Sequence, residues 1–400
     1  MKILLADQLS KACLQALEQA GHSVEVDSSL KDAALVEALR ERNPHVLVVR
    51  STKVPEAAVA ASKNLELIVR AGAGFDTIDV DAASRSGVFV ANCPGKNATA
   101  VAELTMGLLL ALDRSLPDNV SEARAGHWNK KGFSAARGLK GRTLGIIGIG
   151  NIGRVVITRA RAFDMRVVAW SRSLTDEEAA LLGVTRMGGP LEVATVSDAV
   201  SLHVAATPET KALAGRAFFE AMKPGAFFIN TTRGAVVDED ALLWAMKEKG
   251  IRCALDVFSN EPAHKEGPFE HPLASHPQVY LSHHIGASTE QAQDAIAEEA
   301  VRIVLTFAAT GKVPNCVNIA EQSPATHQLT VRHLDKVGVL AAVLDIISKA
   351  GWNVQEMENM IFAGAQAACA NIRFDGAVES SVVNKISAHP DVVAVTLIDL

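Results

Sequence analysis

The sequence predicts an α/β protein with two blocks of doubly wound parallel sheet and a smaller C-terminal unit. Apolar runs alternate with helical periods over residues 1–98, and a second block with the same alternation begins at Thr143. Such alternation places the strands parallel in one sheet and the helices on both of its faces. Residues 327–400 show a different order of strands and helices. A chain of 400 residues has a length typical of two or three domains.

The first block has four candidate strands, which read KILLAD, HVLVVR, LELIVRAG and VFVANC. Helical periods lie between them at Leu14–Ala20 and Ala33–Arg40. A long apolar helix is predicted over Ala98–Arg114. Further on, the polar stretch GHWNKKGFSAARGLKGR has the Gly and Lys content of a loop near a domain border.

The second block has six candidate strands, which read TLGIIG, RVVAW, AVSLHV, AFFINT, CALDVF and VYLSHH. A polar helix is predicted from Thr289 to Ala309. Residues 310–326 are rich in Gly, Pro and Asn, and therefore predict a linker before the C-terminal unit.

The C-terminal unit reads strand, helix, strand, strand, helix, strand, which is the βαββαβ order of a ferredoxin-like fold. Its clearest elements are HQLTVRHL, VGVLAAVLDIISKAG, ESSVVNKISAH and VVAVTLIDL. A unit this small has a marginal core of its own and often pairs with a second copy of itself.

Composition and charge exclude several classes of protein. The chain is 48% apolar and 21% charged with a net charge of −6, which argues against a nucleic-acid-binding protein, because such proteins present a basic face. No apolar run is long enough to cross a membrane, and MKILLADQ reads as a buried strand rather than a signal sequence. The five cysteines form no CxxC pair, which predicts reduced thiols in a cytoplasmic protein, without a disulfide framework or a metal site.

A glycine-rich loop predicts a dinucleotide site. In TLGIIGIGNIGRVV the pattern Gly148-x-Gly150-x-x-Gly153 follows an apolar strand and opens a helix predicted over Arg154–Phe163. Gly148 permits the tight turn, Gly150 lets the backbone approach a pyrophosphate, and Gly153 lets the helix pack closely on the strand. The helix N-terminus favours the negative charge of the pyrophosphate.

The next strand leaves the choice between NAD and NADP open. It ends in VVAWSRS, so Ser171 and Arg172 stand where an acid would bind the adenosine ribose, and the first carboxylate is Asp176. Ser171 and Arg172 can hold a 2′-phosphate, as NADP binding requires. The other interpretation is an exposed polar turn, with NAD held through its remaining contacts.

Five motifs in a fixed order resemble the D-isomer-specific 2-hydroxyacid dehydrogenases: VAELTMGLLLAL, GIIGIGNIG, INTTRGAVVDEDALLWAM, ALDVFSNEP and SHHIGAST. The resemblance covers residues 1–318. It implies two Rossmann-like or flavodoxin-like domains with the active site in the cleft between them. The implied domains are a substrate-binding domain of residues 1–98 and 286–318 and an NAD-binding domain of residues 99–285. Beyond the resemblance, a linker is predicted at 319–326 and a regulatory domain at 327–400.

The same resemblance implies a catalytic set of Arg233, Glu261 and His284. His284 directly precedes Ile285 as the family histidine does, whereas His283 stands where proline is usual. Loss of the hydroxyl proton during hydride transfer suits a histidine. Glu261 would hold the imidazole ring and stabilise its charged form. Arg233 would grip the substrate carboxylate with two hydrogen bonds and polarise the carbonyl oxygen.

The cofactor implied by the resemblance is NAD, with NADP as the alternative. Asp256 would face the nicotinamide carboxamide. The implied cofactor-binding residues are Gly148, Gly150, Asn151, Ile152, Gly153, Ser171, Arg172, Thr231, Thr232, Asp256 and Gly286.

Two loops favour a small phosphorylated substrate. RSTKV and RAGAGFDTID follow strand ends of the first block. They resemble the substrate loops of the family branch that oxidises D-3-phosphoglycerate to 3-phosphohydroxypyruvate in the first step of L-serine biosynthesis. Their cations suit a phosphate. The predicted substrate-binding residues are Arg50, Ser51, Lys53, Arg70 and Gly72.

Two other functions stay open. One is a reductase of hydroxypyruvate, glyoxylate or another 2-keto acid that uses NADPH, which Ser171 and Arg172 favour. The other is a dinucleotide-sensing binding protein, because relatives of this fold include transcriptional corepressors. The intact set of Arg233, Glu261 and His284 favours an enzyme over a sensor.

The C-terminal unit resembles an ACT domain, a regulatory module that binds amino acids, through VRHLDKVGVLAAV. In serine-sensing members the effector positions correspond to His333, Asp335 and Asn353. Asparagine is usual at position 335, and an aspartate there cannot donate a hydrogen bond to the carboxylate of serine. His333 is equally well explained as a polar residue at a strand end. The small unit and the apolar helix at 98–114 predict a homodimer or homotetramer.

Overall fold

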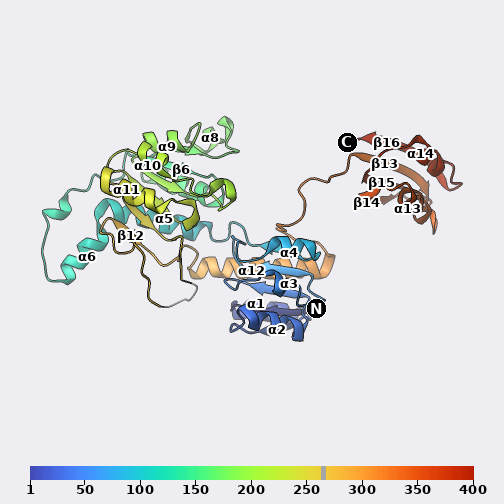
Figure 1. Cartoon of the computed structure of the whole chain (residues 1–400), viewed down its shortest axis with the longest axis horizontal. Coiled ribbons are helices and arrows are strands. Elements are labelled where there is room, and N and C mark those ends of the chain that lie inside the picture. Colours follow the sequence, from blue (N-terminus) through green and yellow to red (C-terminus); the bar gives the residue numbers. More distant parts are fainter. Residues whose placement is uncertain (263–266) are drawn as a thin grey trace. The chain divides into compact units, whose positions relative to one another are not determined.

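The computed structural model describes residues 1–262 and 267–400, coloured from blue to red along the chain in Figure 1. The described residues form two compact units, Met1–Asn318 and Ile319–Leu400. The first unit contains two parallel sheets, and the second contains one antiparallel sheet. The α/β class predicted from the alternation of strands and helices is confirmed.

The first sheet has five parallel strands, and helices cover both of its faces. Its strands are β1 (Lys2–Leu5), β2 (Ser23–Val26), β3 (Val46–Val49), β4 (Leu67–Arg70) and β5 (Phe89–Asn92), in the order β2-β1-β3-β4-β5. One face packs against α1 (Lys11–Gln19) and α12 (Glu290–Thr310), and the other against α2 (Asp32–Arg42), α3 (Glu56–Val59) and α4 (Val80–Arg85). Because both faces are covered, the central strands are continuous apolar runs rather than alternating ones.

The second sheet has seven parallel strands in the order β12-β11-β10-β9-β6-β7-β8. They are β6 (Thr143–Ile147), β7 (Arg166–Trp170), β8 (Thr185–Arg186), β9 (Ala199–Leu202), β10 (Phe227–Asn230), β11 (Arg252–Leu255) and β12 (Val279–Leu281). One face packs against α5 (Ala98–Arg114), α7 (Asn151–Ala162) and α8 (Asp176–Leu182), and the other against α9 (Pro190–Val196), α10 (Arg216–Ala221) and α11 (Glu239–Lys249). The strand order reverses between β6 and β9, and ligands bind at such switch points in doubly wound sheets.

The six predicted strands of this block are present, and the short edge strand β8 was not predicted. The predicted helix over Ala98–Arg114 matches α5 in both bounds. By contrast, α7 begins at Asn151 and not at Arg154, because Gly150 in extended backbone caps the helix and the glycine-rich residues form its first turn. The polar helix predicted from Thr289 is α12, with Thr289 as its cap.

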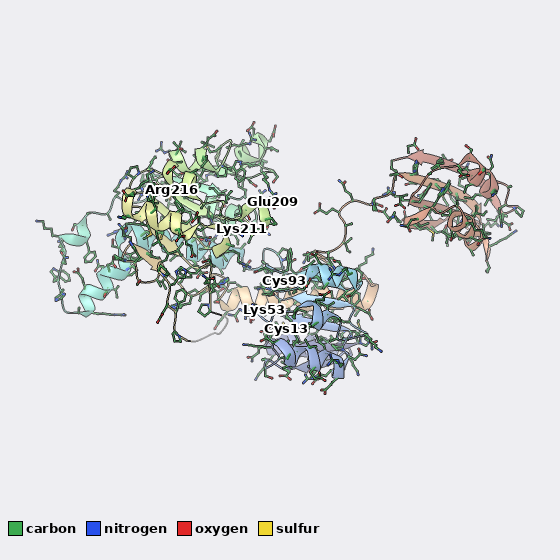
Figure 2. The ribbon with its side chains drawn as sticks, in the orientation of Figure 1. Cys13, Lys53, Cys93, Glu209, Lys211 and Arg216 are labelled. Carbon is green, nitrogen blue, oxygen red and sulfur yellow. The ribbon has the colours of Figure 1, made fainter. Side chains whose placement is uncertain are left out.

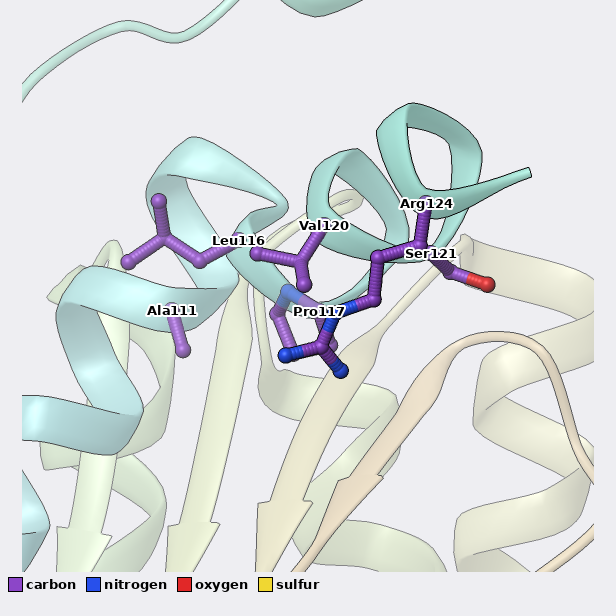
Figure 3. Close-up of a pocket in the computed structure, with 6 residues that line it drawn as sticks. All are labelled: Ala111, Leu116, Pro117, Val120, Ser121 and Arg124. Carbon is purple, nitrogen blue, oxygen red and sulfur yellow. The ribbon is translucent and has the colours of Figure 1, made fainter. Parts of the chain in front are cut away.

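A short helix, α6 (Leu116–Arg124), follows α5 and buries none of its side chains within a single chain. Leu116 and Val120 are each 46% exposed, and Trp128 is 90% exposed in the segment that follows. Figure 3 shows the open pocket at this helix. It is lined by Ala111, Leu116, Pro117, Val120, Ser121 and Arg124, and none of these residues carries a predicted catalytic role.

The second unit has the predicted βαββαβ order. Its elements are β13 (His327–Leu334), α13 (Val339–Lys349), β14 (Asn353–Ile361), β15 (Ala367–Asp375), α14 (Ser380–Ser387) and β16 (Val392–Asp399). The strands pair antiparallel in the order β14-β15-β13-β16. A small core lies between the sheet and the two helices, where Trp352 stacks on Phe374 with ring centroids 4.3 Å apart.

From the sequence we expect neither a membrane-spanning segment nor a metal site. Over residues 1–262 and 267–400, no helix is long and apolar enough to cross a bilayer. The same part of the chain holds no group of three or more His, Cys, Asp or Glu side chains arranged to bind a metal ion. All five cysteines have free thiols, and three of them are buried.

Candidate active site

Three parallel strands bring the predicted catalytic motifs to one edge of the second sheet. Arg233 lies three residues after β10, Asp256 directly follows β11, and His284 lies three residues after β12. The strands β10, β11 and β12 are parallel neighbours, so their carboxyl ends lie at the same edge. Glu261 lies in the loop after β11, before residues 263–266, and therefore reaches the same edge.

His284 and Glu261 form a direct pair. Nδ1 of His284 lies 2.7 Å from Oε2 of Glu261, while Oε1 of Glu261 accepts a hydrogen bond from the N–H of Phe258 at 3.0 Å. Burial alone raises the pKa of Glu261, but the hydrogen bonds from His284 and Phe258 and the charges of His284 and Arg233 outweigh it and lower that pKa. A carboxylate bound to Nδ1 leaves Nε2 of the ring to exchange a proton. His283 is exposed beside this pair.

Asp256 holds the loop that carries His284. Its carboxylate is 1% exposed and accepts hydrogen bonds from the hydroxyl of Ser282 at 2.6 Å and the N–H groups of Ile285 and Gly286 at 2.9 and 2.8 Å. Its carbonyl oxygen accepts from the N–H of His284 at 2.8 Å. His284 has a φ of 51°, a region that non-glycine residues rarely adopt, so this network maintains an unfavourable backbone conformation. The predicted contact of Asp256 with the nicotinamide stays a prediction.

The side chain of Arg233 is oriented by two residues. Its Nη2 donates to Oδ1 of Asp76 at 3.1 Å and its Nε to Oδ2 at 3.4 Å, while Nη1 donates to the carbonyl of Thr232 at 2.8 Å. Asn230 shapes the turn, because it accepts from the N–H and hydroxyl of Thr232 and donates to the carbonyl of Arg233. Asp76 was absent from the sequence prediction.

The glycine-rich loop has the geometry that a pyrophosphate requires. Gly148 has a φ of 97°, and a Cβ there would overlap the carbonyl of His203, while a Cβ on Gly153 would overlap the carbonyl of Gly148. At Gly150, in contrast, no atom of the described chain lies within 4 Å of an added Cβ. The backbone is therefore open at the position where α7 begins and presents its unpaired N–H groups. The glycine-rich loop and the first turn of α7 therefore fit the pyrophosphate of NAD.

The other predicted cofactor residues lie on several elements at this edge. Thr231 and Thr232 are buried, with the hydroxyls of Thr231 and Thr105 3.3 Å apart. Asn151 and Ile152 open α7. Gly286 is buried, and a Cβ there would lie tightly against Oδ2 of Asp256 at 3.1 Å and Cγ2 of Val101 at 3.3 Å. Ser171 and Arg172 directly follow β7, where Ser171 is half-buried and Arg172 is exposed.

The first predicted substrate loop is organised around Asp7. The carboxylate of Asp7 accepts hydrogen bonds from the backbone N–H groups of Arg50, Ser51 and Thr52 at 2.7, 3.0 and 3.0 Å, and from the hydroxyl of Ser51 at 3.0 Å. Burial raises the pKa of Asp7, but these N–H donors outweigh it and lower that pKa. The N–H and the hydroxyl of Ser51 therefore both bind Asp7 and stabilise the conformation of this loop. Lys53 is exposed on the same loop (Figure 2).

The second substrate loop brings cations together. Arg70 ends β4 and folds back over Gly72, which has a φ of 157° and has no room for a side chain beneath the guanidinium. Burial lowers the pKa of Arg70, as do the charges of Arg233 and Arg50, whereas Asp76 raises it. The residues Arg50, Arg70 and Arg233 therefore form a cationic cluster.

The predicted effector residues do not come together within one chain. His333 is 2% exposed, and its Nε2 lies 3.2 Å from Oδ1 of Asn359, while its Nδ1 lies 2.8 Å from the carbonyl of Leu334. Asn353 begins β14 and pairs with Asp375, at the far end of the sheet from His333, which pairs with Ala368. Within one chain the antiparallel register brings Asn359, and not Asn353, beside His333, and the effector role of His333 and Asn353 stays a prediction. Asp335 is exposed just after β13.

A further anchor for the Glu261 loop was missed by the sequence analysis. Glu239, in the first turn of α11, accepts hydrogen bonds from the N–H and hydroxyl of Ser259 at 2.9 and 2.6 Å and lies 3.2 Å from Nε2 of His271. An acid in the first turn of a helix is usual for helix stability alone. The local sequence around Glu239 therefore does not indicate that this residue contacts the loop of Glu261.

Known proteins resemble this chain in sequence and in fold. Residues 106–286 match the family profile "D-isomer specific 2-hydroxyacid dehydrogenase, NAD binding domain". A D-3-phosphoglycerate dehydrogenase of Methanocaldococcus jannaschii is 39% identical over 327 residues, which are 80% of this chain and 61% of that protein. The chain therefore spans about three fifths of that relative's length.

Two solved structures share the fold of most of the chain. The TT0316 protein of Thermus thermophilus is 33% identical, with a TM-score of 0.71 over 79% of this chain and 100% of that one. The NAD+-bound 3-phosphoglycerate dehydrogenase of Entamoeba histolytica is 26% identical, with a TM-score of 0.66 over 80% of this chain and 99% of that one.

Proposed function

Because the chain belongs to the D-isomer-specific 2-hydroxyacid dehydrogenase family, we propose that it is an NAD-dependent oxidoreductase that interconverts D-3-phosphoglycerate and 3-phosphohydroxypyruvate. The observation that carries this proposal is the His284–Glu261 pair, 2.7 Å apart, on the same sheet edge as Arg233. The similarity to the 3-phosphoglycerate dehydrogenases of Methanocaldococcus jannaschii and Entamoeba histolytica supports the choice of substrate.

The proton chemistry follows from the orientation of the histidine ring. Glu261 accepts the N–H at Nδ1 of His284, which leaves Nε2 as the atom that takes the hydroxyl proton of the substrate during oxidation. In the reverse direction, the same Nε2 returns the proton to the developing alkoxide. The carboxylate of Glu261 stabilises the charged ring in both directions. The glycine-rich loop, from Gly148 to Gly153, would hold NAD, which would supply the acceptor for the hydride on C2 of the hydroxy acid.

The cationic cluster supports a substrate with two negative groups. Arg233 can hold the carboxylate beside the reacting carbon through two hydrogen bonds, and it can polarise the carbonyl oxygen. Arg50 and Arg70 are close enough to interact with this charge and leave cationic surface for a phosphate. Lys53 adds a further exposed cation on the loop of Arg50.

A second candidate function is the reduction of an unphosphorylated 2-keto acid with NADPH. The observation that favours it is the end of β7, where Ser171 and Arg172 replace the acid that selects NAD. A third candidate function, based on the same glycine-rich loop, is a sensor that binds a dinucleotide without turnover. All three functions use the glycine-rich loop; the first two differ in substrate and cofactor, and the third lacks turnover.

We also propose that the second unit is an ACT-type effector domain and that the chain forms a homodimer or larger assembly. The order of β13 to β16 supports the first proposal, and the uncovered side chains of α6 support the second. The domain limits predicted from the resemblance, with the substrate-binding domain at 1–98 and 286–318 and the NAD-binding domain at 99–285, are part of this proposal. Packing of α12 on the first sheet supports them.

The test is the rate of cofactor oxidation by purified protein. Phosphohydroxypyruvate and hydroxypyruvate are each offered with NADH and with NADPH. We expect the highest kcat/KM with phosphohydroxypyruvate and NADH. Equal or better use of hydroxypyruvate would replace the proposal with the general reductase, and absence of turnover with every 2-keto acid would favour the sensor.

A further inference from the structure

We propose that Asp76 is a positioning residue, which orients the guanidinium of Arg233 so that its end faces the carboxylate of the substrate. The inference rests on the proposed function of the site. Asp76 lies in the loop after β4 of the first sheet, and Arg233 lies after β10 of the second, 157 residues away. The ion pair thus joins loops from two different sheets.

The hydrogen bonds of Arg233 show which N–H groups of its guanidinium are already paired within the protein. The group has five N–H donors in a planar fork. Those of Nε and one of Nη2 lie on one side and reach the two oxygens of Asp76, at 3.4 and 3.1 Å. One N–H of Nη1 reaches the carbonyl of Thr232 at 2.8 Å. Among the described residues, one N–H of Nη1 and one N–H of Nη2 remain beyond these contacts, and these donors can bind the oxygens of a carboxylate.

The loop that carries Asp76 is shaped to the same guanidinium. A Cβ added to Gly74 would overlap Nη2 of Arg233 and would lie 2.8 Å from Oδ1 of Asp76. The backbone of the loop therefore lies close to the ion pair, and a side chain at position 74 would have to displace the ends of Arg233 and Asp76. This close approach is independent of the hydrogen bonds and indicates that the pair is built into the loop.

Charge explains why an acid is needed at this position. Arg70 and Arg233 interact as like charges, and Asp76 interacts favourably with both. Burial raises the pKa of Asp76, but the hydrogen bond and charge of Arg233 outweigh it and lower that pKa, so the residue stays ionised at neutral pH. Without the negative charge of Asp76, repulsion from Arg70 would turn the guanidinium of Arg233 away from a substrate that both arginines contact.

An opposite role for Asp76 is conceivable on the same contacts. Its carboxylate could occupy the place of the substrate carboxylate and have to leave before the substrate binds. The two roles predict opposite results. A positioning residue lowers substrate affinity when it is removed, whereas a competitor raises it. The side-on contact, which leaves the end of the guanidinium uncommitted, favours positioning.

The first test compares Asp76→Asn and Asp76→Ala with the wild type in the reduction of phosphohydroxypyruvate by NADH. Loss of charge-assisted hydrogen bonds should raise KM about 10- to 100-fold in Asp76→Ala and less in Asp76→Asn. We expect kcat to fall much less than KM rises, and the dissociation constant of NADH, from fluorescence titration, to stay unchanged. Glu56→Gln, which breaks the exposed Glu56–Arg85 pair of the same domain, is the matched control and should alter none of these values. An unchanged or lower KM in both Asp76 variants would overturn the inference.

The second test separates orientation from simple charge compensation and does not depend on turnover. Oxamate, a non-reducible mimic of a 2-keto acid, is titrated calorimetrically into the NADH-loaded protein, for the wild type, Asp76→Asn, Arg233→Lys and the double variant. Lysine keeps the charge but has no planar fork to orient, so Asp76→Asn should weaken oxamate binding far less in the Arg233→Lys background. The same fold-change in both backgrounds contradicts positioning. If the wild type neither binds oxamate nor reduces any 2-keto acid, the proposed function and this inference both fail. Normal wild-type behaviour with unaffected Asp76 variants overturns only the inference.

Discussion

Nδ1 of His284 lies 2.7 Å from Oε2 of Glu261, although the two residues belong to loops that follow different strands. Hydrogen bonds hold both loops: Asp256, which begins the loop of Glu261, holds the histidine loop, and Glu239 of α11 holds Ser259 in the glutamate loop. The distance between the proton-transfer pair is therefore set by hydrogen bonds that tie the two loops to each other and to α11.

Glu261→Gln should remove most of the activity while preserving the fold. Glutamine has the same shape but cannot stabilise a charged imidazole, and general acid–base catalysis contributes roughly 10²- to 10⁴-fold to rate. We expect kcat to fall by about 10²-fold or more, with the dissociation constant of NADH unchanged. Steady-state kinetics beside an NADH titration would check this. Retention of more than half of the wild-type kcat would show that Glu261 does not act on His284.

Gly150→Ala and Gly153→Ala should have different effects on cofactor binding and on stability. A Cβ on Gly153 would overlap the carbonyl of Gly148, so this variant should lower both the Tm and the affinity for NADH. A Cβ on Gly150 would meet no described atom within 4 Å, so that variant should keep its Tm and lose NADH affinity, because its methyl group points into the pyrophosphate space. Thermal denaturation and NADH fluorescence titration measure the two effects. A Gly150→Ala variant with normal NADH affinity would place the pyrophosphate elsewhere.

Arg172→Ala should discriminate between the two cofactors. If Arg172 binds a 2′-phosphate, its removal should lower kcat/KM with NADPH about tenfold or more and leave kcat/KM with NADH within about twofold. Ser171→Asp should shift the preference further toward NADH, because a carboxylate repels the phosphate and accepts a hydrogen bond from the ribose hydroxyl. Equal changes with both cofactors would indicate that this turn has no part in their selection.

Glu299 should make the stability of the protein depend on pH in the acid range. It is 7% exposed on α12 and bonds to Arg302 at 2.5 and 3.0 Å, to Asn315 at 2.7 Å, and to Lys96 at 3.3 Å. The hydrogen bonds from Arg302, then from Asn315 and Lys96, outweigh burial and lower the pKa of Glu299 from 4.5 to about 2.

A lowered pKa in the folded state means that the carboxylate stabilises the fold above its unfolded pKa, and that this stability is lost as pH falls through its folded pKa. The contribution is up to about 3 kcal/mol, present above about pH 4.5 and lost between about pH 4.5 and 2. Urea unfolding at pH 7 and pH 3 should therefore show a smaller difference for Glu299→Gln than for the wild type. Glu298→Gln, at an exposed position on the same helix, is the control and should behave as the wild type does.

Val120→Asp should shift the protein toward a smaller assembly if α6 packs against another copy of the chain. Val120 is 46% exposed and lines the open pocket of Figure 3 with apolar neighbours. A buried charge at an apolar interface is costly. Light scattering at micromolar concentration should give an oligomer for the wild type and a lower mass for the variant. A wild-type monomer would refute the proposed assembly.

Much of the fold could be predicted because its signals are local. The alternation of apolar runs and helical periods is a property of short segments, and it correctly indicated two parallel sheets and the βαββαβ order. The glycine spacing and the family motifs likewise identified Gly148, Gly150, Gly153, Arg233 and His284 as residues that the structure brings to one sheet edge. The start of α7 was predicted three residues late, because Gly150 caps the helix and Asn151, Ile152 and Gly153 of the loop already belong to its first turn.

The missed residues share a physical cause, which is contact across long sequence separations. Asp76 and Arg233 are 157 residues apart, Asp7 and Arg50 are 43 apart, and Glu239 and Ser259 are 20 apart. A lone acid at each position is compatible with an ordinary solvated loop or helix end, so no local pattern distinguishes it. Likewise, only the pairing of β14 with β15 decides that Asn359 and not Asn353 lies beside His333.

The sequence by itself therefore determined the classes of element, the dinucleotide loop and the identity of the three residues proposed for catalysis, because each is written in a few adjacent positions. Only the tertiary structure decided how those residues are held: Asp256 against the histidine loop, Glu239 against the glutamate loop, and Asp76 against Arg233. Parallel sheets bring the ends of distant strands to one edge, and the hydrogen bonds made there depend on side-chain positions that the chain reaches only when both sheets have formed.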